Sequence, residues 1–239
     1  MQCLILAGGL GTRMQGVADG IAKTLVPVAG RPFCDHQLTW LSAQGVRHIV
    51  YAIGHRGAQI RDFVGDGARW GLEVEYIDEG ERLLGTGGAV RRAVDLAGNG
   101  AGIEGGFLVL YGDSYLTTDV GAVWAASGGG AFAVMSVMKN TGRWDASNAV
   151  LESGMVTAYE KGRTDAAAIG MEYIDYGLSV LTPEVVRAHI PAREVRDLAD
   201  VFQPLAAAGR LRGFEAADRF YEIGSPEGLA DLENFLAAP

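Results

Sequence analysis

The chain has 239 residues, of which 49% are apolar, and a formal net charge of −9 at pH 7. A chain of this length can bury one sizeable core, so we expect a single globular domain over residues 1–239. The acidic balance, without runs of Lys and Arg, argues against a general nucleic-acid binder, because such proteins use clustered cations to displace counterions.

The first element is a short apolar run, Cys3–Ala7, with no basic segment before it. This pattern is typical of a first β-strand rather than of a signal peptide, and no apolar run is long enough to cross a membrane. The two cysteines, Cys3 and Cys34, lack CxxC spacing and indicate reduced thiols rather than a disulfide framework or a zinc site. These features predict a cytoplasmic protein without a membrane partner.

Further short aliphatic runs, bounded by glycine or polar residues, indicate buried strands. After the first run they are His48–Ile53, Leu72–Ile77, Phe107–Tyr111 and Ala131–Val137. Apolar residues at helical spacing predict helices between them, at Phe33–Ala43, Ala58–Val64 and Gly88–Leu96. This alternation predicts an α/β fold, a three-layer α/β/α sandwich around a mostly parallel mixed sheet.

After about residue 140 the candidate elements become shorter. Strands are predicted at Ala149–Glu152, Val156–Glu160 and Tyr173–Leu181, and helices near Pro183–Ala188 and Leu198–Ala208. The glycine-rich stretches 98–106 and 128–130 fall where a helix returns to a strand, so they are interpreted as loops and not as domain linkers. The sequence after about residue 140 therefore predicts a lobe that belongs to the same domain.

A glycine-rich loop follows the first strand directly. Its sequence is Ala7-Gly8-Gly9-Leu10-Gly11-Thr12-Arg13-Met14. Such a loop lets backbone N–H groups surround phosphate oxygens, while Arg13 adds a forked cation. It matches neither the dinucleotide G-x-G-x-x-G pattern nor the Gly-Lys-Ser/Thr of a P-loop.

Together with a second segment, this loop closely resembles the signature of the sugar-1-phosphate nucleotidylyltransferases. The two parts are Ile5–Arg13 and Ala22-Lys23-Thr24-Leu25-Val26-Pro27-Val28-Ala29-Gly30-Arg31-Pro32. The resemblance implies the Rossmann-like fold of nucleotide-diphospho-sugar transferases and transfer of a nucleoside monophosphate from an NTP to a sugar 1-phosphate. Residues 1–140 or so would form the nucleotide-binding half, and about 141–239 the sugar-phosphate-binding half.

The resemblance also implies which residues bind the nucleotide. The phosphate contacts would be Ala7, Gly8, Gly9, Gly11, Thr12 and Arg13. Lys23 would contact phosphate near the reacting centre, and Ala22 replaces the usual proline before it, which makes the turn less rigid. Residues 84–89 resemble the family's second glycine turn, so Gly85 and Thr86 are candidate base contacts; alternatively, Thr86 caps a helix. Glu79 and Glu81 precede this turn but stay outside the predicted set, because loop glutamates are usually solvated.

Two carboxylates resemble the family's magnesium ligands. Asp113 ends the apolar strand that leads to Gly112, and strand ends in open α/β sheets are where ligands bind. Glu222, before Ile223-Gly224, stands where the family has aspartate. Because Mg²⁺ prefers hard oxygen ligands and keeps several waters, Asp113, Glu222 and the NTP phosphates would suffice, with Mn²⁺ as a substitute.

The second half resembles the family's acceptor site. The residues implied to contact the sugar phosphate are Asn148, Glu160, Lys161, Asp175 and Gly177. Asp175 takes the place of a common asparagine, which removes a hydrogen-bond donor and predicts a different hydroxyl pattern in the sugar. The catalytic cations would be Arg13, Lys23 and Lys161, and no histidine is assigned a role.

Alternatives remain open at this point. A metal-dependent glycosyltransferase would carry a D-x-D motif, whereas this chain has Asp113-Ser114-Tyr115. A non-catalytic relative that binds sugar nucleotides is the other alternative. Within the family, residues 84–89 look most like heptose 1-phosphate guanylyltransferases, and residues 65–72 like N-acetylmuramate 1-phosphate uridylyltransferases. The substrates expected are therefore an NTP, with GTP favoured, and a sugar 1-phosphate; a homo-oligomer is left open.

Overall fold

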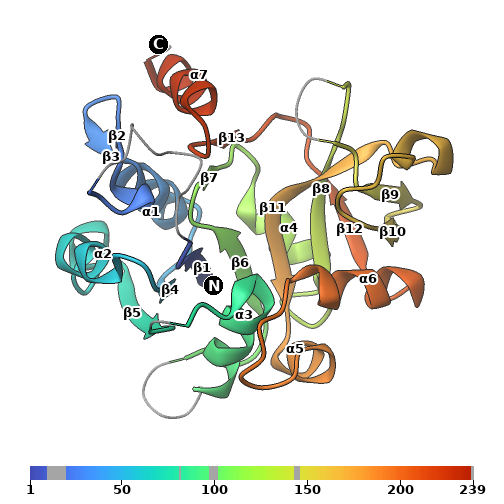
Figure 1. The fold of residues 1–239 in the computed structure, drawn as a ribbon, viewed down its shortest axis with the longest axis horizontal. Helices are drawn as coiled ribbons and strands as arrows, with labels where there is room; N and C mark the ends of the chain where they lie inside the picture. The colour runs from blue at the N-terminus through green and yellow to red at the C-terminus, as the bar shows by residue number, and fades with distance from the viewer. Residues whose placement is uncertain (10–19, 81, 97–101, 143–145, 238–239) are drawn as a thin grey trace.

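A nine-stranded mixed sheet runs through the centre of the protein (Figure 1). The computed structural model describes residues 1–9, 20–80, 82–96, 102–142 and 146–237. The strand order is β5 (Glu73–Asp78), β4 (His48–Ile53), β1 (Gln2–Ala7), β6 (Phe107–Tyr111), β11 (Tyr173–Leu181), β8 (Val134–Lys139), β12 (Arg212–Glu215), β10 (Met155–Tyr159) and β9 (Ala149–Glu152). The first four are parallel, and β11 is antiparallel to both of its neighbours, β6 and β8.

Helices cover both faces of the sheet. One face packs against α1 (Phe33–Ala43), α2 (Gly57–Val64) and α4 (Val120–Ala126). The other packs against α3 (Gly85–Asp95), α5 (Pro183–His189) and α6 (Ala199–Ala207). In β1 the residues Cys3, Leu4 and Ile5 are all fully buried, as expected for a parallel strand that has helices on both sides. The predicted three-layer α/β/α sandwich is confirmed.

Smaller elements complete the molecule on the side where the chain ends. The hairpin of β2 (Pro27–Val28) and β3 (Arg31–Pro32) packs with α7 (Pro226–Ala237) around Phe33 and Leu232. A second small sheet pairs β7 (Ser114–Tyr115) with β13 (Tyr221–Glu222). The connections within the described residues include the 3₁₀ turns η2 (Lys23–Leu25), η3 (Ala68–Trp70) and η4 (Ala166–Ile169).

Most predicted boundaries differ from the structure by at most two residues, but two predicted starts were wrong by three. The strand expected from residue 131 begins at Val134, because the turn through residues 128–130 continues and both Ala131 N–H and Phe132 N–H donate to the Ser127 carbonyl. Helix α3 begins at Gly85, three residues before the predicted start at Gly88, because the Arg196 carbonyl accepts from the N–H groups of its first turn. In the described part of the chain, no helix is both long and apolar enough to span a membrane.

The order of the parallel strands sets the position of the functional site. From β1 the chain runs to β4 and β5 on one side and then returns to β6 on the other, so the order reverses between β1 and β6. In open α/β sheets the crevice at such a switch point, beyond the carboxyl ends of the strands, is where ligands bind. The segments that follow β1, β4, β5 and β6 here all reach the same crevice.

Candidate functional site

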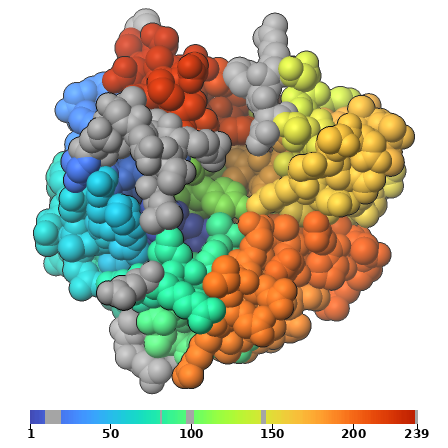
Figure 2. All heavy atoms as spheres, viewed as in Figure 1, coloured from blue at the N-terminus to red at the C-terminus, as the bar shows by residue number. Residues whose placement is uncertain are grey.

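A cavity of ≈ 340 Å³ occupies this crevice. Its walls come from the ends of the parallel strands, from the segment at residues 21–24 and from the start of α3. In the space-filling view the same face is hollowed near its centre, between parts coloured cyan, green and orange (Figure 2). Of the predicted nucleotide contacts, Ala7, Gly8, Gly9, Lys23, Gly85, Thr86 and Asp113 all line the cavity. Gly11, Thr12 and Arg13 lie outside the described residues.

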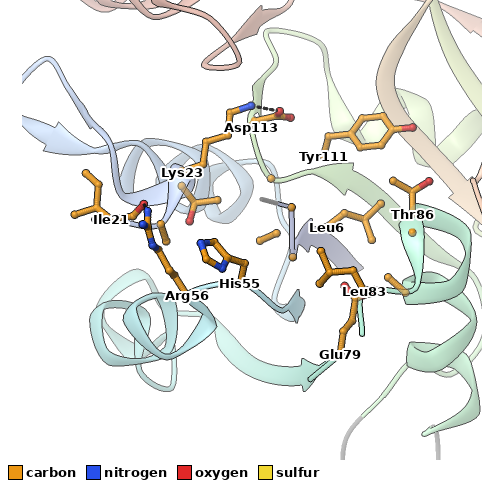
Figure 3. A pocket seen from close by; sticks show the side chains of 18 residues that line it. Leu6, Ile21, Lys23, His55, Arg56, Glu79, Leu83, Thr86, Tyr111 and Asp113 are labelled. Atoms are coloured by element: carbon orange, nitrogen blue, oxygen red, sulfur yellow. Dashed lines mark hydrogen bonds and ion pairs between the residues drawn. The ribbon is translucent and has the colours of Figure 1, made fainter. Parts of the chain in front are cut away.

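Lys23 and Asp113 form an ion pair at one wall of the cavity (Figure 3). The Lys23 ammonium lies 2.6 Å from Asp113 Oδ2, and their side chains are 17% and 33% exposed. Asp113 sits just after β6 in a turn held by Gln37 of α1, whose amide donates to the carbonyls of Tyr111 and Ser114 at 3.1 and 2.8 Å. The sheet and α1 thus present a carboxylate and a cation together, 90 positions apart in sequence.

The segment before Lys23 is held by side chains of α2 and of its N-cap residue, Arg56. Gln59 Oε1 accepts from Ala22 N–H at 2.7 Å, and Gln59 Nε2 donates to the Gly20 carbonyl at 2.9 Å. Arg56 Nη1 donates to the Ile21 carbonyl at 2.8 Å. Replacing proline by Ala22 was expected to make this turn less rigid. The hydrogen bonds from Gln59 and Arg56 restrain the turn instead, and the sequence pattern gives no sign of them.

Glu79, which was left outside the predicted set, forms part of the opposite wall. Its Oε2 accepts from Leu84 N–H at 2.8 Å, and its Oε1 lies against Gly8, where a Cβ atom would collide with it. Burial raises the pKa of the Glu79 carboxyl, and the Leu84 N–H bond opposes that change. A side chain at position 8 would therefore displace the end of the Glu79 side chain from its present position. The only sequence signal was the position of Glu79 ahead of the glycine turn.

The glycines of the second glycine turn lie against the backbone of another segment of the chain. Gly85 has φ +72°, and a Cβ atom there would lie 2.5 Å from the Arg196 carbonyl oxygen. Cβ atoms on Gly87 and Gly88 would meet the carbonyls of Asp197 and Glu194 at 2.7 and 2.6 Å. The turn thus packs directly against residues 194–197 of the second half.

Thr86 does not cap its helix, so that alternative was wrong. Its Oγ1 accepts from Leu198 N–H at 2.8 Å, and α3 has no side-chain cap. Thr86 therefore ties the start of α3 to the segment that leads into α6. Its place on the cavity wall is compatible with a base contact as well.

The predicted acceptor residue Lys161 lies beside the segment that leads into α6. Lys161 Nζ lies 3.1 Å from Asp197 Oδ1, and Asp197 also accepts from Ala199 N–H. Burial raises the pKa of Asp197, but the Ala199 N–H and the Lys161 ammonium outweigh it, so the pKa is held below its usual range. Asp197 was missed from the sequence because its role depends on contacts across the fold. Glu160 pairs with Arg163 at 2.8 Å on the surface.

Asp175 is another of the predicted acceptor residues. Its Oδ2 accepts from the Tyr159 hydroxyl at 3.2 Å and its Oδ1 from Gly177 N–H at 3.0 Å. Asn148 Oδ1 accepts from the Asp175 N–H at 2.9 Å, so three of the predicted acceptor residues form one network. Burial raises the pKa of Asp175, and the Gly177 N–H and the Lys161 charge oppose this only in part.

The predicted metal ligand Asp113 lies in the turn just before β7, the strand that pairs with β13, which carries Glu222. Glu222 of β13 pairs with Ser114 of β7, and Ile223 N–H donates to the Asp113 carbonyl at 3.0 Å. The Glu222 carboxylate accepts from Gly224 N–H at 2.9 Å and does not line the cavity. Among the described residues, no three His, Cys, Asp or Glu side chains are grouped as a metal site. Both residues carry hard-oxygen donors that suit Mg²⁺, whose remaining positions water and phosphate can fill, and their backbones are adjacent, although the Glu222 carboxylate is directed to its own turn.

Comparisons with known proteins agree with this geometry. A family model described as nucleotidyl transferase matches residues 2–238. A mannose-1-phosphate guanylyltransferase of Mycobacterium tuberculosis is 27% identical over 99% of this chain, which spans 66% of that protein. A D-glycero-alpha-D-manno-heptose 1-phosphate guanylyltransferase of Campylobacter jejuni is 26% identical, with 99% of both chains aligned.

A solved structure is similar over the whole length. The crystal structure of HddC from Yersinia pseudotuberculosis complexed with GMP-PN has a TM-score of 0.79 to this chain at 26% identity, covering 98% of this chain and 99% of that one. The likeness therefore extends over the sheet and both helical layers.

Proposed function

The chain belongs to the nucleotidyl transferase family, and on that premise we propose that it transfers a nucleoside monophosphate from an NTP to a sugar 1-phosphate and releases pyrophosphate. The observation that carries the proposal is the Lys23–Asp113 pair, which lies in a cavity at the switch point of the sheet. A cation and a carboxylate placed there suit a triphosphate and its divalent metal.

The reaction needs charge compensation rather than a general base. An oxygen of the sugar phosphate, already anionic, attacks the α-phosphorus, and the bond to the bridging oxygen breaks as pyrophosphate leaves. Lys23 would contact the triphosphate and Lys161 the sugar phosphate, so that each cation offsets charge where the two anions approach. Mg²⁺ held by Asp113, Glu222 and the phosphates would neutralise further charge on the NTP. Arg13 is proposed to bind the departing pyrophosphate.

Guanine is the base that we propose. One oxygen of the Glu79 carboxylate is occupied by Leu84 N–H, and the other is directed to the cavity beside Gly8. A carboxylate only accepts hydrogen bonds, and the guanine edge offers adjacent N–H donors. Uracil and thymine would place carbonyl oxygens on both sides of their one donor. Two similar proteins are named guanylyltransferases, which supports this choice.

A heptose 1-phosphate is the proposed acceptor. The Campylobacter relative that aligns over both full lengths is named for that sugar. Asp175, in place of an asparagine, supplies the acceptor side with a half-buried carboxyl held by Tyr159 and Gly177. Uridylyl transfer to N-acetylmuramate 1-phosphate is the second candidate, since the Neisseria meningitidis enzyme of that name is 36% identical over 50% of this chain.

Pyrophosphate release tests both levels of the proposal. The purified protein is incubated with Mg²⁺, each of ATP, GTP, CTP, UTP and dTTP, and a panel of sugar 1-phosphates that includes mannose, glucose, heptose and N-acetylmuramate forms. We expect release that requires the acceptor and is fastest with GTP and the heptose phosphate. Release without any acceptor would contradict transferase activity, whereas a preference for UTP would overturn only the assignment of the base.

A further inference from the structure

We propose that Gln59 is a positioning residue that holds Lys23 at the cavity by fixing the backbone of residues 20–22. The inference rests on the proposed function, in which Lys23 contacts the triphosphate. Gln59 lies on α2 and is not itself in the cavity wall. It acts only through the segment to which it is hydrogen-bonded.

Both ends of the Gln59 amide are engaged by that segment. Its oxygen accepts from Ala22 N–H at 2.7 Å and its nitrogen donates to the Gly20 carbonyl at 2.9 Å, which spans two residues of backbone as a paired strand would. Arg56, one turn earlier, donates to the carbonyl between them, at Ile21. Three hydrogen bonds from α2 and its N-cap residue therefore hold three consecutive residues.

The hydrogen bonds to residues 20–22 also fix the position of Lys23, the next residue in the chain. Ala22 is buried, and its carbonyl accepts from Leu25 N–H at 2.8 Å, which closes the 3₁₀ turn that begins at Lys23. The orientation of the Ala22 peptide thus sets the direction in which the Lys23 side chain leaves the backbone. From that position its ammonium reaches Asp113.

The conformation of Ala22 explains why a side chain is used for this purpose. Ala22 has φ −64°, the value that a proline ring would impose by itself, and ψ 138°, an extended value that proline also adopts. Proline, however, has no N–H, so it would lose the bond to Gln59 and place its ring against the Gln59 oxygen. The chain therefore restrains residue 22 by a hydrogen bond from α2, where a ring would restrain it covalently. Each device makes the other unnecessary.

That exclusivity gives a rescue experiment. We compare wild type, Gln59→Leu, Ala22→Pro and the double variant Gln59→Leu/Ala22→Pro, with Asp62→Leu as a control on the exposed side of α2. Melting temperature and circular dichroism establish that each variant is folded. The kcat and both KM values are then measured from pyrophosphate release with the best NTP and acceptor.

We expect Gln59→Leu to lower kcat about tenfold, the rate factor that corresponds to losing a pair of ordinary hydrogen bonds, with little change in the KM for the acceptor. The double variant should recover to within about threefold of wild type, because proline restores the restraint on φ. Asp62→Leu should match wild type. A double variant no faster than Gln59→Leu would overturn the proposal.

A second comparison separates positioning from a general structural role. In a Lys23→Met background, Gln59→Leu should not lower the residual rate further, because residues that act as a unit are not additive. A further tenfold loss there would overturn the inference. If Gln59→Leu does not fold, Gln59→Glu, which keeps the acceptor for Ala22 N–H, replaces it, and its rate must fall less in the Lys23→Met background than in wild type.

Failure of the proposed function would be recognised separately. Wild type that releases no pyrophosphate with any NTP and acceptor would refute that function. The role of Gln59 is then judged from the rise in melting temperature caused by inorganic pyrophosphate with Mg²⁺. A rise that is smaller in Gln59→Leu and recovered in the double variant supports positioning, and equal rises in all variants, or none in any, overturn it.

Discussion

The ammonium of Lys23 lies 2.6 Å from Oδ2 of Asp113, so a cation of the protein itself occupies an oxygen that a metal ion would use. If Asp113 binds Mg²⁺ as proposed, Lys23 and the metal would compete for the same carboxylate as long as no nucleotide is bound. A triphosphate would change this balance, because it would offer Lys23 a new anionic partner and offer the metal further oxygens. Ordered assembly of the site would follow from that exchange.

Lys23→Met is expected to fold normally and to bind Mg²⁺ more tightly than wild type in the absence of nucleotide, because Asp113 loses its competitor. Turnover should nevertheless fall about 10²–10³-fold, as when one group that stabilises transition-state charge is removed. Titration calorimetry with Mg²⁺ and initial rates test the two parts. Lys139→Met, at an exposed ion pair, is the matched control. Unchanged magnesium affinity would contradict competition between Lys23 and the metal.

Glu222→Gln should lower the rate steeply at low Mg²⁺, because a neutral amide is a poor magnesium ligand, whereas Glu222→Asp should be much milder. Gln can still accept from Gly224 N–H, so the turn into α7 is preserved. The measurement is a magnesium titration of the initial rate at saturating NTP and acceptor. Superimposable curves for wild type and Glu222→Gln would leave Asp113 as the single protein ligand of the proposal.

Glu79→Gln is expected to reduce the preference for GTP over UTP by about ten- to hundredfold, the factor for a hydrogen bond to a charged group. The amide oxygen can still accept from Leu84 N–H, so the wall of the cavity should remain intact. Ratios of kcat/KM for the two nucleotides measure the effect, with the exposed Glu73→Gln as control. An unchanged ratio would remove Glu79 from base recognition.

Asp175→Asn should raise the melting temperature at pH 7–8 and have no stabilising effect in acid. Burial raises the pKa of Asp175 in the folded protein, so the folded state binds its proton more tightly than the unfolded chain does. That contribution to stability is complete below the unfolded pKa, about 3.9, and is lost as pH rises through the folded value. Melting curves from pH 4 to 8 test the sign. A variant less stable than wild type at pH 8 would contradict it.

Thr86→Val should destabilise the fold by about 1 kcal/mol, which lowers the melting temperature by about 2–4 °C. The methyl group fills the same space but cannot accept from Leu198 N–H, which is left without its partner. Thr86→Ser keeps the hydroxyl and should retain most of the stability. Equal melting temperatures for Thr86→Val and wild type would contradict the prediction and would show that water replaces Thr86 as the acceptor for Leu198 N–H.

Much of the fold was predictable because buried parallel strands and their covering helices leave strong apolar patterns. The strands at Cys3–Ala7 and His48–Ile53 are examples, and both occur in the structure with at most one residue of difference. The start of α3 was not predictable, since it depends on the Arg196 carbonyl, more than 100 positions away. A glycine in sequence does not reveal which backbone approaches it.

Some residues of the candidate site could likewise be predicted from the sequence, and others could not. Lys23 and Asp113 could be proposed from motifs, and the structure brings them into contact. Gln59 and Asp197 could not, because each acts on a partner remote in sequence through hydrogen bonds that no local pattern specifies. For Glu222 the strand pairing places the residue beside Asp113, yet its carboxylate is directed to its own turn. Motifs identify reactive groups, and tertiary contacts decide how those groups are held.

The fit between the glycine turn and residues 194–197 restricts how this enzyme can be recombined with its relatives. Gly85, Gly87 and Gly88 each lack room for a side chain because carbonyls of that segment occupy the space. A chimera that takes its first half from one relative and its second half from another would join two surfaces that have not evolved to fit each other. Such hybrids should function only when both partners carry matching versions of this contact, so substitutions at the three glycines should covary with changes in the path of the opposing segment.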